Sequence, residues 1–205
     1  MRMIIRTAIL ILGSSFELGA EPGHAADNFK LEDGYSLLFN GKDLTGWEHG
    51  YCPPGTKPND EKLDGKTAST NNIFHVADRL LVATGKGPRA VYTTKEFNKD
   101  FHLKLEFRTP ADNKKNNSGV FIRGPQLQLD GTNAGGLTNV FKNIKNFKEG
   151  DWNEIDITVK GQEAICKCNG EPVGKAMKIP AAGTIGLQSE IGKFEFRRVR
   201  IKELP

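Results

Sequence analysis

Hydrophobic and polar residues alternate with a period of two along most of the chain from Asp27 onward. Alternation of this kind is typical of strands that bury one face, and no window of a dozen residues keeps the spacing of an amphipathic helix. The clearest case runs from Phe101 to Arg108, with Phe and Leu on one face and His, Lys, Glu and Arg on the other. The pattern predicts an all-β domain with strands at residues 36–39, 73–76, 79–83, 90–93, 101–109, 119–123, 126–129, 154–160, 163–168, 183–188 and 193–202.

Turn residues separate the predicted strands. Asn169-Gly170 is the signature of a two-residue type I′ hairpin, and the Lys-Gly-Gln sequence at residues 160–162 closes another hairpin. Many short strands with turns roughly 8 to 12 residues apart indicate a sandwich or a barrel. Residues 48–71 are rich in Pro, Gly, Asp and Lys and lack periodicity, so they are expected to form a long surface loop. Such a loop is either functional or a tolerated insertion.

The N-terminal residues have the order of a secretory signal peptide. Arg2 and Arg6 accompany an apolar run that ends at Leu12, and mostly small residues follow at 23–26. The run is too short to span a bilayer, and no Cys follows it, so no stable membrane anchor is expected. Residues 1–25 are therefore predicted to be a signal peptide and residues 26–205 one exported domain, periplasmic or secreted.

The charge distribution gives no indication of a nucleic-acid partner. The formal net charge is +4, the excess is spread along the chain, and the densest basic cluster is Lys142, Lys145 and Lys148. A nucleic-acid surface needs a sustained basic stripe with stacking aromatic residues, and the sequence has neither. The charge pattern therefore argues against a nucleic-acid ligand.

The cysteines and histidines predict neither a metal site nor a cofactor. Three Cys residues, at 52, 166 and 168, are an odd number for a disulfide framework, although Cys52 has two possible partners if the fold brings it close. The four His residues are scattered, which metal ligands are not. Asp60, Asp64 and Asp130 are possible Ca²⁺ ligands, but their spacing matches no calcium-loop signature.

A polar row stands out in the two strands predicted between residues 116 and 131. Val120 and Ile122 share one face of the first strand, and Leu127 and Leu129 share one face of the second. The opposite faces carry Arg123, Gln126, Gln128 and Asp130. Planar hydrogen-bonding groups in a line suit recognition of several hydroxyls, as in sugar binding, whereas the alternative is an ordinary exposed sheet face. Trp47 and Trp152 are either stacking platforms for a sugar ring or core residues.

Six segments together resemble the exported 3-keto-disaccharide hydrolase domain family. They are LLFNGKDLTGW at 37–47, LKLEFRT at 103–109, NSGVFIRG at 117–124, QLQLDGTNAG at 126–135, GDWNEIDITVKG at 150–161 and GTIGLQSEIGKFEFRRVRIKEL at 183–204. The resemblance implies a concanavalin-like jelly roll of two antiparallel sheets with a carbohydrate site on its concave face. It also implies cleavage of a glycoside whose C3 hydroxyl has been oxidised to a ketone. The ketone acidifies the C2 proton, so a base forms an enediolate, the group at C1 leaves, and water then adds.

The family motifs supply candidates for each role in this reaction. Glu106 and Glu190 are the expected acid and base. The side chains expected to hold the ketone or nearby hydroxyls are Arg108, Arg123, Gln126, Gln128, Asn117, Asp130 and Trp47. For Asn117, and for Ser118 beside it, the alternative is hydrogen bonding within the local turn.

Two departures from the family pattern fall within the expected site. The family commonly has Glu-x-Gln where this chain has Gln126-Leu127-Gln128, and an acidic residue and an aromatic where it has Gly135-Gly136. An amide cannot accept a proton at neutral pH. A non-catalytic carbohydrate-binding module is therefore kept as the alternative to an enzyme, and an envelope interaction domain without a sugar ligand as the third hypothesis.

Overall fold

The computed structural model describes residues 28–55, 61–110, 115–132, 141 and 143–205, without the side chains of residues 130–132. Residues 32–205 form one compact unit, and the described residues 28–31 of a separate N-terminal unit contain no helix or strand. The one helical element in the described ranges is a 3₁₀ turn, η1 (Thr70–Asn72). No described helix has the length and hydrophobicity needed to cross a membrane.

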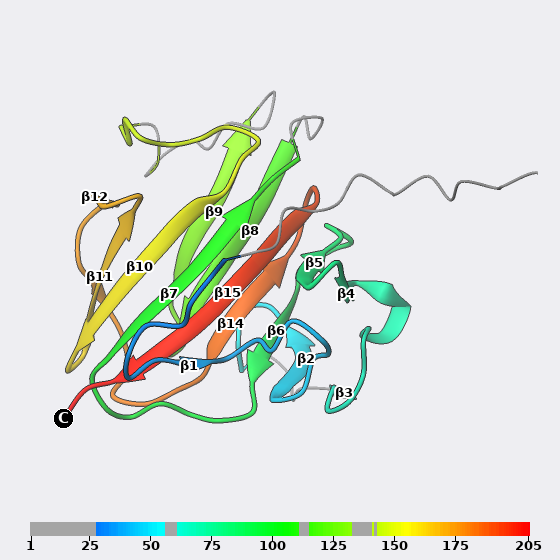
Figure 1. The fold of residues 1–205 in the computed structure, drawn as a ribbon, viewed down its shortest axis with the longest axis horizontal. Helices are drawn as coiled ribbons and strands as arrows, with labels where there is room; N and C mark the ends of the chain where they lie inside the picture. Colours follow the sequence, from blue (N-terminus) through cyan, green and yellow to red (C-terminus); the bar gives the residue numbers. More distant parts are fainter. Residues whose placement is uncertain (1–27, 56–60, 111–114, 133–140, 142) are drawn as a thin grey trace, which may run out of the picture. The chain divides into compact units, whose positions relative to one another are not determined.

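Two antiparallel sheets make up residues 32–205 (Figure 1). The first sheet has the order β12–β11–β10–β7–β15–β5–β4, with β1 also paired to β15 and β13 to β11. Its strands are β1 (Ser36–Leu37), β4 (Phe74–Ala77), β5 (Leu80–Ala83), β7 (Phe101–Arg108), β10 (Asn153–Lys160), β11 (Glu163–Cys168), β12 (Glu171–Pro172), β13 (Met177–Lys178) and β15 (Phe194–Glu203).

The second sheet has the order β3–β2–β6–β14–β8–β9. Its strands are β2 (Trp47–Tyr51), β3 (Glu61–Lys62), β6 (Arg89–Thr93), β8 (Lys115–Ile122), β9 (Gln126–Thr132) and β14 (Ile185–Ser189). The two sheets form an all-β sandwich, as the alternation predicts, and strands far apart in sequence lie side by side: β14 pairs with both β6 and β8.

One hydrophobic core lies between the sheets. The first sheet contributes the apolar face of β7, where Phe101, Leu103, Leu105 and Phe107 are fully buried. The second sheet contributes apolar residues of β8, β9 and β14, including Val120, Leu129 and Leu187. Burying each of these side chains stabilises the fold by roughly 1.5–3 kcal/mol. Because side chains alternate along a strand, the intervening residues of every such strand point outward.

The structure differs from the sequence prediction at two places in the second sheet. Strand β3 and all of β2 except Trp47 lie within residues 48–71, which were expected to be a loop. The buried positions of β2 after its tryptophan are His49 and Gly50, so no hydrophobic alternation marks the strand. Strand β8 begins at Lys115 rather than at 119, because its first buried positions are Asn116 and Ser118.

The expected hairpin turn at 169–170 has the backbone that its type requires. Asn169 and Gly170 both have positive φ, at 48° and 85°. The three cysteines are free thiols, and Cys166 and Cys168 are buried in the core face of β11. Burial raises the pKa of both thiols to about 12, so they stay protonated and unreactive at neutral pH.

Candidate functional site

The outer face of the second sheet carries the polar row. Gln126 and Gln128 on β9 point away from the core, because Leu127 between them is buried in it. Gln188 on β14 lies on the same outer face, since Leu187 beside it belongs to the core. This face therefore combines amide side chains from strands that are more than fifty residues apart in the sequence.

Hydrogen bonds join these side chains to one another. Gln126 Nε2 donates to Gln188 Oε1 at 2.5 Å, and Gln188 Nε2 donates to Glu190 Oε2 at 2.8 Å. Gln128 Nε2 donates to Asn117 Oδ1 on the neighbouring strand β8. These five residues are called the amide row below. Gln188 is 4% exposed, whereas the other four are half-buried and remain accessible to a ligand.

Gly119 makes room for the amide row. It pairs with Gln128 across β8 and β9, and it has an ordinary strand backbone rather than a positive φ. A Cβ atom at Gly119 would lie 1.9 Å from Gln126 Nε2. The Gln126 side chain therefore lies across the bare backbone of β8 on its way to Gln188 on β14.

An apolar patch borders the amide row on the same face. Tyr92 and Phe121 are 2% exposed and their ring centroids are 5.6 Å apart. A Cβ atom at Gly186 would lie 2.6 Å from the Tyr92 ring and 3.1 Å from the Phe121 ring, so this glycine lets both rings close over β14. Cys52 packs against the patch, and its Sγ lies 3.8 Å from Tyr92 Oη.

The titratable groups of this patch are neutral at ordinary pH. Burial raises the pKa of the Cys52 thiol to about 11, although hydrogen bonding with Tyr92 and Gln188 opposes the shift. Burial also raises the pKa of Tyr92, whose hydroxyl donates to the Tyr51 carbonyl oxygen at 2.8 Å. Neither group is suited to act as a nucleophile or base at neutral pH.

The prediction that Arg123 belongs to the polar row is wrong. Arg123 has a positive φ of 51°, which turns its side chain out of the strand alternation. Its guanidinium donates to the carbonyl oxygens of Lys99 and Gly161, the latter at 3.1 Å, and lies 5.2 Å from the centroid of the Phe101 ring in the first sheet. Arg123 is 3% exposed, so its side chain is held by these contacts and does not face a ligand.

The structure does not bring Glu106 together with Glu190. Glu106 lies on β7 and points out from the first sheet, where Arg197 Nε and Arg198 Nη1 donate to its oxygens at 2.7 Å and 2.5 Å. The hydrophobic core separates it from the amide row. The expected pairing of these two carboxylates as acid and base at one substrate is therefore wrong.

Arg108 lies on the same outer face of the first sheet as Glu106. Its Nε donates to Glu195 Oε2 at 2.5 Å, and its guanidinium lies 4.7 Å from the centroid of the half-buried Trp152 ring. Arg197 lies 4.0 Å from the same ring. Arg108 thus belongs to an ion-pair and cation–π network and has no place in the amide row.

Trp47 is a core residue and cannot stack on a sugar. It is fully buried, and its Nε1 donates to the Leu38 carbonyl oxygen at 2.7 Å. The side chain of Asp130 lies outside the described residues, although its backbone pairs with Asn117 across β8 and β9. Asp60 is also outside the described residues, while Asp64 Oδ1 accepts a hydrogen bond from the Gly46 backbone N–H at 2.8 Å.

Sequence reasoning missed Gln188 and Gly119. Both lie within quoted motifs, GLQSE and NSG, but alternation within one strand cannot show that β14 lies beside β8. Among the described residues, no three His, Cys, Asp or Glu side chains are arranged to hold a metal ion. The arrangement that the structure does show offers amide donors and acceptors beside one carboxylate, which is chemistry suited to hydroxyl recognition and proton transfer.

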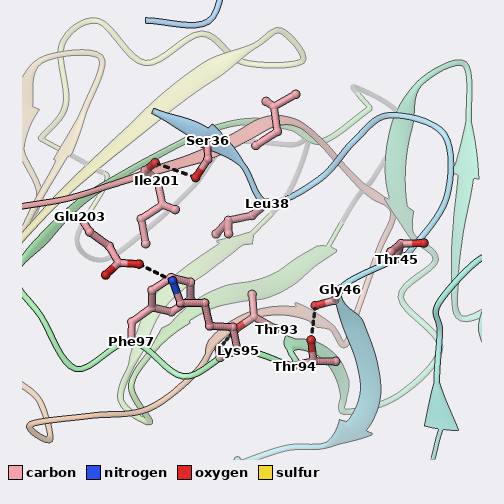
Figure 2. Close-up of a pocket in the computed structure, with 11 residues that line it drawn as sticks. Ser36, Leu38, Thr45, Gly46, Thr93, Thr94, Lys95, Phe97, Ile201 and Glu203 are labelled. Carbon is pink, nitrogen blue, oxygen red and sulfur yellow. Dashed lines mark hydrogen bonds and ion pairs between the residues drawn. The ribbon is translucent and has the colours of Figure 1, made fainter. Parts of the chain in front are cut away.

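A separate cavity of about 220 Å³ lies beside β1, β2, β6 and β15 (Figure 2). Half-buried Leu38 and buried Phe97 and Ile201 contribute apolar lining, and the ion pair between Lys95 and Glu203 lies at its margin. The hydrogen bond from Lys95 holds the pKa of Glu203 below its ordinary value. None of the predicted site residues lines this cavity, so it does not compete with the amide row as the predicted site.

Solved structures with the same fold include carbohydrate-active and carbohydrate-binding proteins. A protein from Parabacteroides distasonis ATCC 8503, named as a candidate glycosyl hydrolase, is 21% identical with a TM-score of 0.63, covering 84% of this chain and 94% of that one. A second such protein from the same organism is 20% identical with a TM-score of 0.56, covering 83% and 99%. The carbohydrate-binding module CBM66 from Bacillus subtilis is 11% identical with a TM-score of 0.51, covering 78% and 96%. These similarities confirm the jelly-roll fold.

A family model describes most of the sequence. Residues 34–202 match the 3-keto-alpha-glucoside-1,2-lyase-like domain, which is the family of 3-keto-disaccharide hydrolase domains that the motifs predict. A comparison with curated proteins finds no match. The family match supports a carbohydrate-active function with a carbohydrate ligand. Because the match covers well over half of its length, the chain belongs to the 3-keto-alpha-glucoside-1,2-lyase-like domain family.

Proposed function

We propose that the chain cleaves 3-keto-glycosides by elimination at the outer face of the second sheet. The observation that carries the proposal is the amide row, in which Glu190 is hydrogen-bonded to Gln188 and through it to Gln126. A 3-keto-glycoside is neutral and rich in hydroxyls, so amide groups match its hydrogen-bonding needs. The family name supports this reaction class as the proposal, and the hydrogen bonds of the amide row support this face as its site.

In this proposal Glu190 is the base for the C2 proton. The C2–H bond breaks, the proton goes to the carboxylate, and the electron pair forms an enediolate with its negative charge on the C3 oxygen. That charge then drives the C1–O bond to break, and the protonated Glu190 returns its proton to the departing oxygen, which leaves as the alcohol. The remaining unsaturated 3-keto sugar then adds water. A positioned base of this kind contributes about 10²–10⁴-fold to the rate.

The amides orient the sugar and stabilise the developing charge. Asn117 Oδ1 accepts from Gln128, so the amino group of Asn117 is directed elsewhere and can donate to the C3 oxygen. Gln126 and Gln128 hold hydroxyls of the same ring. The apolar patch of Tyr92 and Phe121 lies beside the row and limits the access of water from that side.

The test is cleavage of 3-keto-trehalose by the purified protein, followed by NMR against the spontaneous rate. The proposal predicts release above that rate, and a loss of about 10² or more in the Glu190→Gln variant. The matched control is Glu106→Gln, which lies on the other sheet and should leave turnover unchanged. Release no faster than the spontaneous rate would reject catalysis.

A non-catalytic carbohydrate-binding module is the second candidate. Two observations favour it. Position 126 holds an amide, and the hydrophobic core separates Glu106 from the amide row. The discriminating change is Gln126→Glu. If the natural protein only binds the sugar and this variant cleaves it, the chain is a binding module that has lost its catalytic site. If the natural protein already cleaves the sugar and the variant does so at the same rate, the binding-module hypothesis is rejected.

A further inference from the structure

The two hydrogen bonds that join Gln126, Gln188 and Glu190 in the amide row run in one direction, and Glu190 sets that direction. An ionised carboxylate accepts hydrogen bonds and donates none. Gln188 must therefore turn its amino group toward Glu190, at 2.8 Å, and its carbonyl oxygen toward Gln126. Gln126 must in turn direct its amino group to Gln188, at 2.5 Å. The carbonyl oxygen of Gln126 is then directed away from Gln188 and is available to accept a hydrogen bond.

We propose that Gln188 is a positioning residue that makes position 126 a hydrogen-bond acceptor for a ligand hydroxyl and suits it to an amide rather than a carboxylate. A carboxylate at position 126 would face the carbonyl oxygen of Gln188, so that two acceptors would be in contact. Protonation of that carboxylate relieves the contact. The alternative relief is rotation of the Gln188 amide, which breaks its hydrogen bond to Glu190.

The packing around Gln188 supports a fixed orientation. Gln188 is 4% exposed, and Gly119 leaves the passage through which Gln126 reaches it. Gln188 has hydrogen-bond partners on two sides, Gln126 and Glu190. A buried amide with partners on several sides has little freedom to turn, because each partner that it leaves loses a hydrogen bond worth about 0.5–1.5 kcal/mol.

The other titratable and charged groups on this face do not reproduce the effect of Gln188. Burial keeps the Cys52 thiol and the Tyr92 hydroxyl protonated throughout the acid range. Lys115 at the start of β8 carries positive charge, which lowers the pKa of a nearby carboxyl. The negative charge of Glu190 raises the pKa of such a carboxyl. The test below separates the effect of this charge on the pKa from the effect of the Gln188 carbonyl.

The test is an NMR titration of the Gln126→Glu variant with isotope-labelled glutamate side chains. The pKa of the carboxyl introduced at position 126 is expected at least about one unit above the ordinary Glu value of about 4.3. An ordinary value in this single variant overturns the proposal. The measurement needs no substrate, so its outcome is independent of the proposed function.

Two double variants assign the cause. In the double variant Gln126→Glu with Gln188→Ala, the Glu190 charge remains but the carbonyl oxygen that faces position 126 is gone. The pKa of the introduced carboxyl should therefore return toward the ordinary value. A pKa that stays raised assigns the effect to Glu190 and overturns the role of Gln188. In Gln126→Glu with Glu190→Gln, the Gln188 amide is free to turn and donate, so the pKa should fall to the ordinary value or below. A pKa unchanged by this second substitution also contradicts the one-way arrangement.

The consequence for the ligand rests on the proposed function and has its own readout. Gln188→Ala in the otherwise natural chain should raise KM for 3-keto-trehalose about tenfold, with a smaller change in kcat. A tenfold change corresponds to the loss of about one hydrogen bond between uncharged groups. A purely structural role would lower the amount of folded protein and leave KM unchanged. An unchanged KM together with a raised pKa in the titration would overturn the ligand contact at position 126 and leave only the orienting effect of Gln188 on that position.

Discussion

The Glu106→Gln variant separates the roles of the two outer faces. Glu106 is 9% exposed and accepts hydrogen bonds from Arg197 and Arg198 on the adjacent strand β15. The substitution keeps the size of the side chain but removes its charge and places an amino group against one guanidinium. The structure predicts a loss of stability, and the proposed function predicts no accompanying loss of turnover.

The magnitude follows from burial and charge. A hydrogen bond to a charged group contributes about 1.5–3 kcal/mol, and two are weakened here. The side chains of Arg197 and Arg198 are 26% and 22% exposed, so water replaces part of what they lose. The expected cost is about 1–3 kcal/mol, which for a domain of this size corresponds to a fall in Tm of about 3–10 °C.

Calorimetry or thermal unfolding monitored by circular dichroism measures this change, and Glu163→Gln is the matched control. Glu163 lies in the same sheet and pairs with Lys178 at 3.0 Å, but the two side chains are 53% and 88% exposed. The loss of such a surface pair costs at most about 0.5 kcal/mol. If Glu106→Gln keeps the natural Tm and loses turnover of 3-keto-trehalose, the assignment of the two faces is refuted.

Three further predictions concern stability and reactivity. Gly186→Ala should destabilise the fold by about 1–3 kcal/mol in urea unfolding, because the added methyl group meets the buried rings of Tyr92 and Phe121; an unchanged unfolding midpoint would contradict this packing. Cys52 should react with iodoacetamide at pH 7 far more slowly than a free thiol, because burial raises its pKa to about 11. Rapid alkylation of Cys52 measured by mass spectrometry would contradict this prediction. Burial acts to raise the pKa of Glu195, but hydrogen bonds from its two basic partners outweigh it and the pKa is lowered. The stability that Glu195 contributes is therefore present above its unfolded pKa of about 4.3 and is lost as pH falls through the lower folded value, so Tm should fall less steeply in acid for Glu195→Gln than for the natural chain.

The sequence predicted the faces of single strands well. Alternation placed Leu103 and Leu105 in the core and Gln126 and Gln128 on an outer face, as the structure shows. This succeeds because a strand that buries one face must carry apolar residues at every second position. Strand β2 was missed because its buried positions after the tryptophan are His49 and Gly50, which give no hydrophobic signal.

Two errors at the site have different physical causes. Arg123 leaves the alternation because its backbone has a positive φ, which is uncommon for a residue other than Gly and has no reliable sequence signature. Glu106 was assigned to the correct side of its own strand, but alternation cannot say which sheet a strand joins. Pairing of β7 with β10 and β15, each tens of residues away in sequence, places Glu106 on the sheet opposite Glu190.

A crystal structure of the Glu190→Gln variant with a bound 3-keto-glucoside tests the central claim most directly, since the missing base should leave the sugar intact. The account predicts the sugar on the outer face of the second sheet, with its hydroxyls within hydrogen-bonding distance of Gln126 and Gln128. A sugar bound instead on the outer face of the first sheet, beside Trp152 and Glu106, would contradict it.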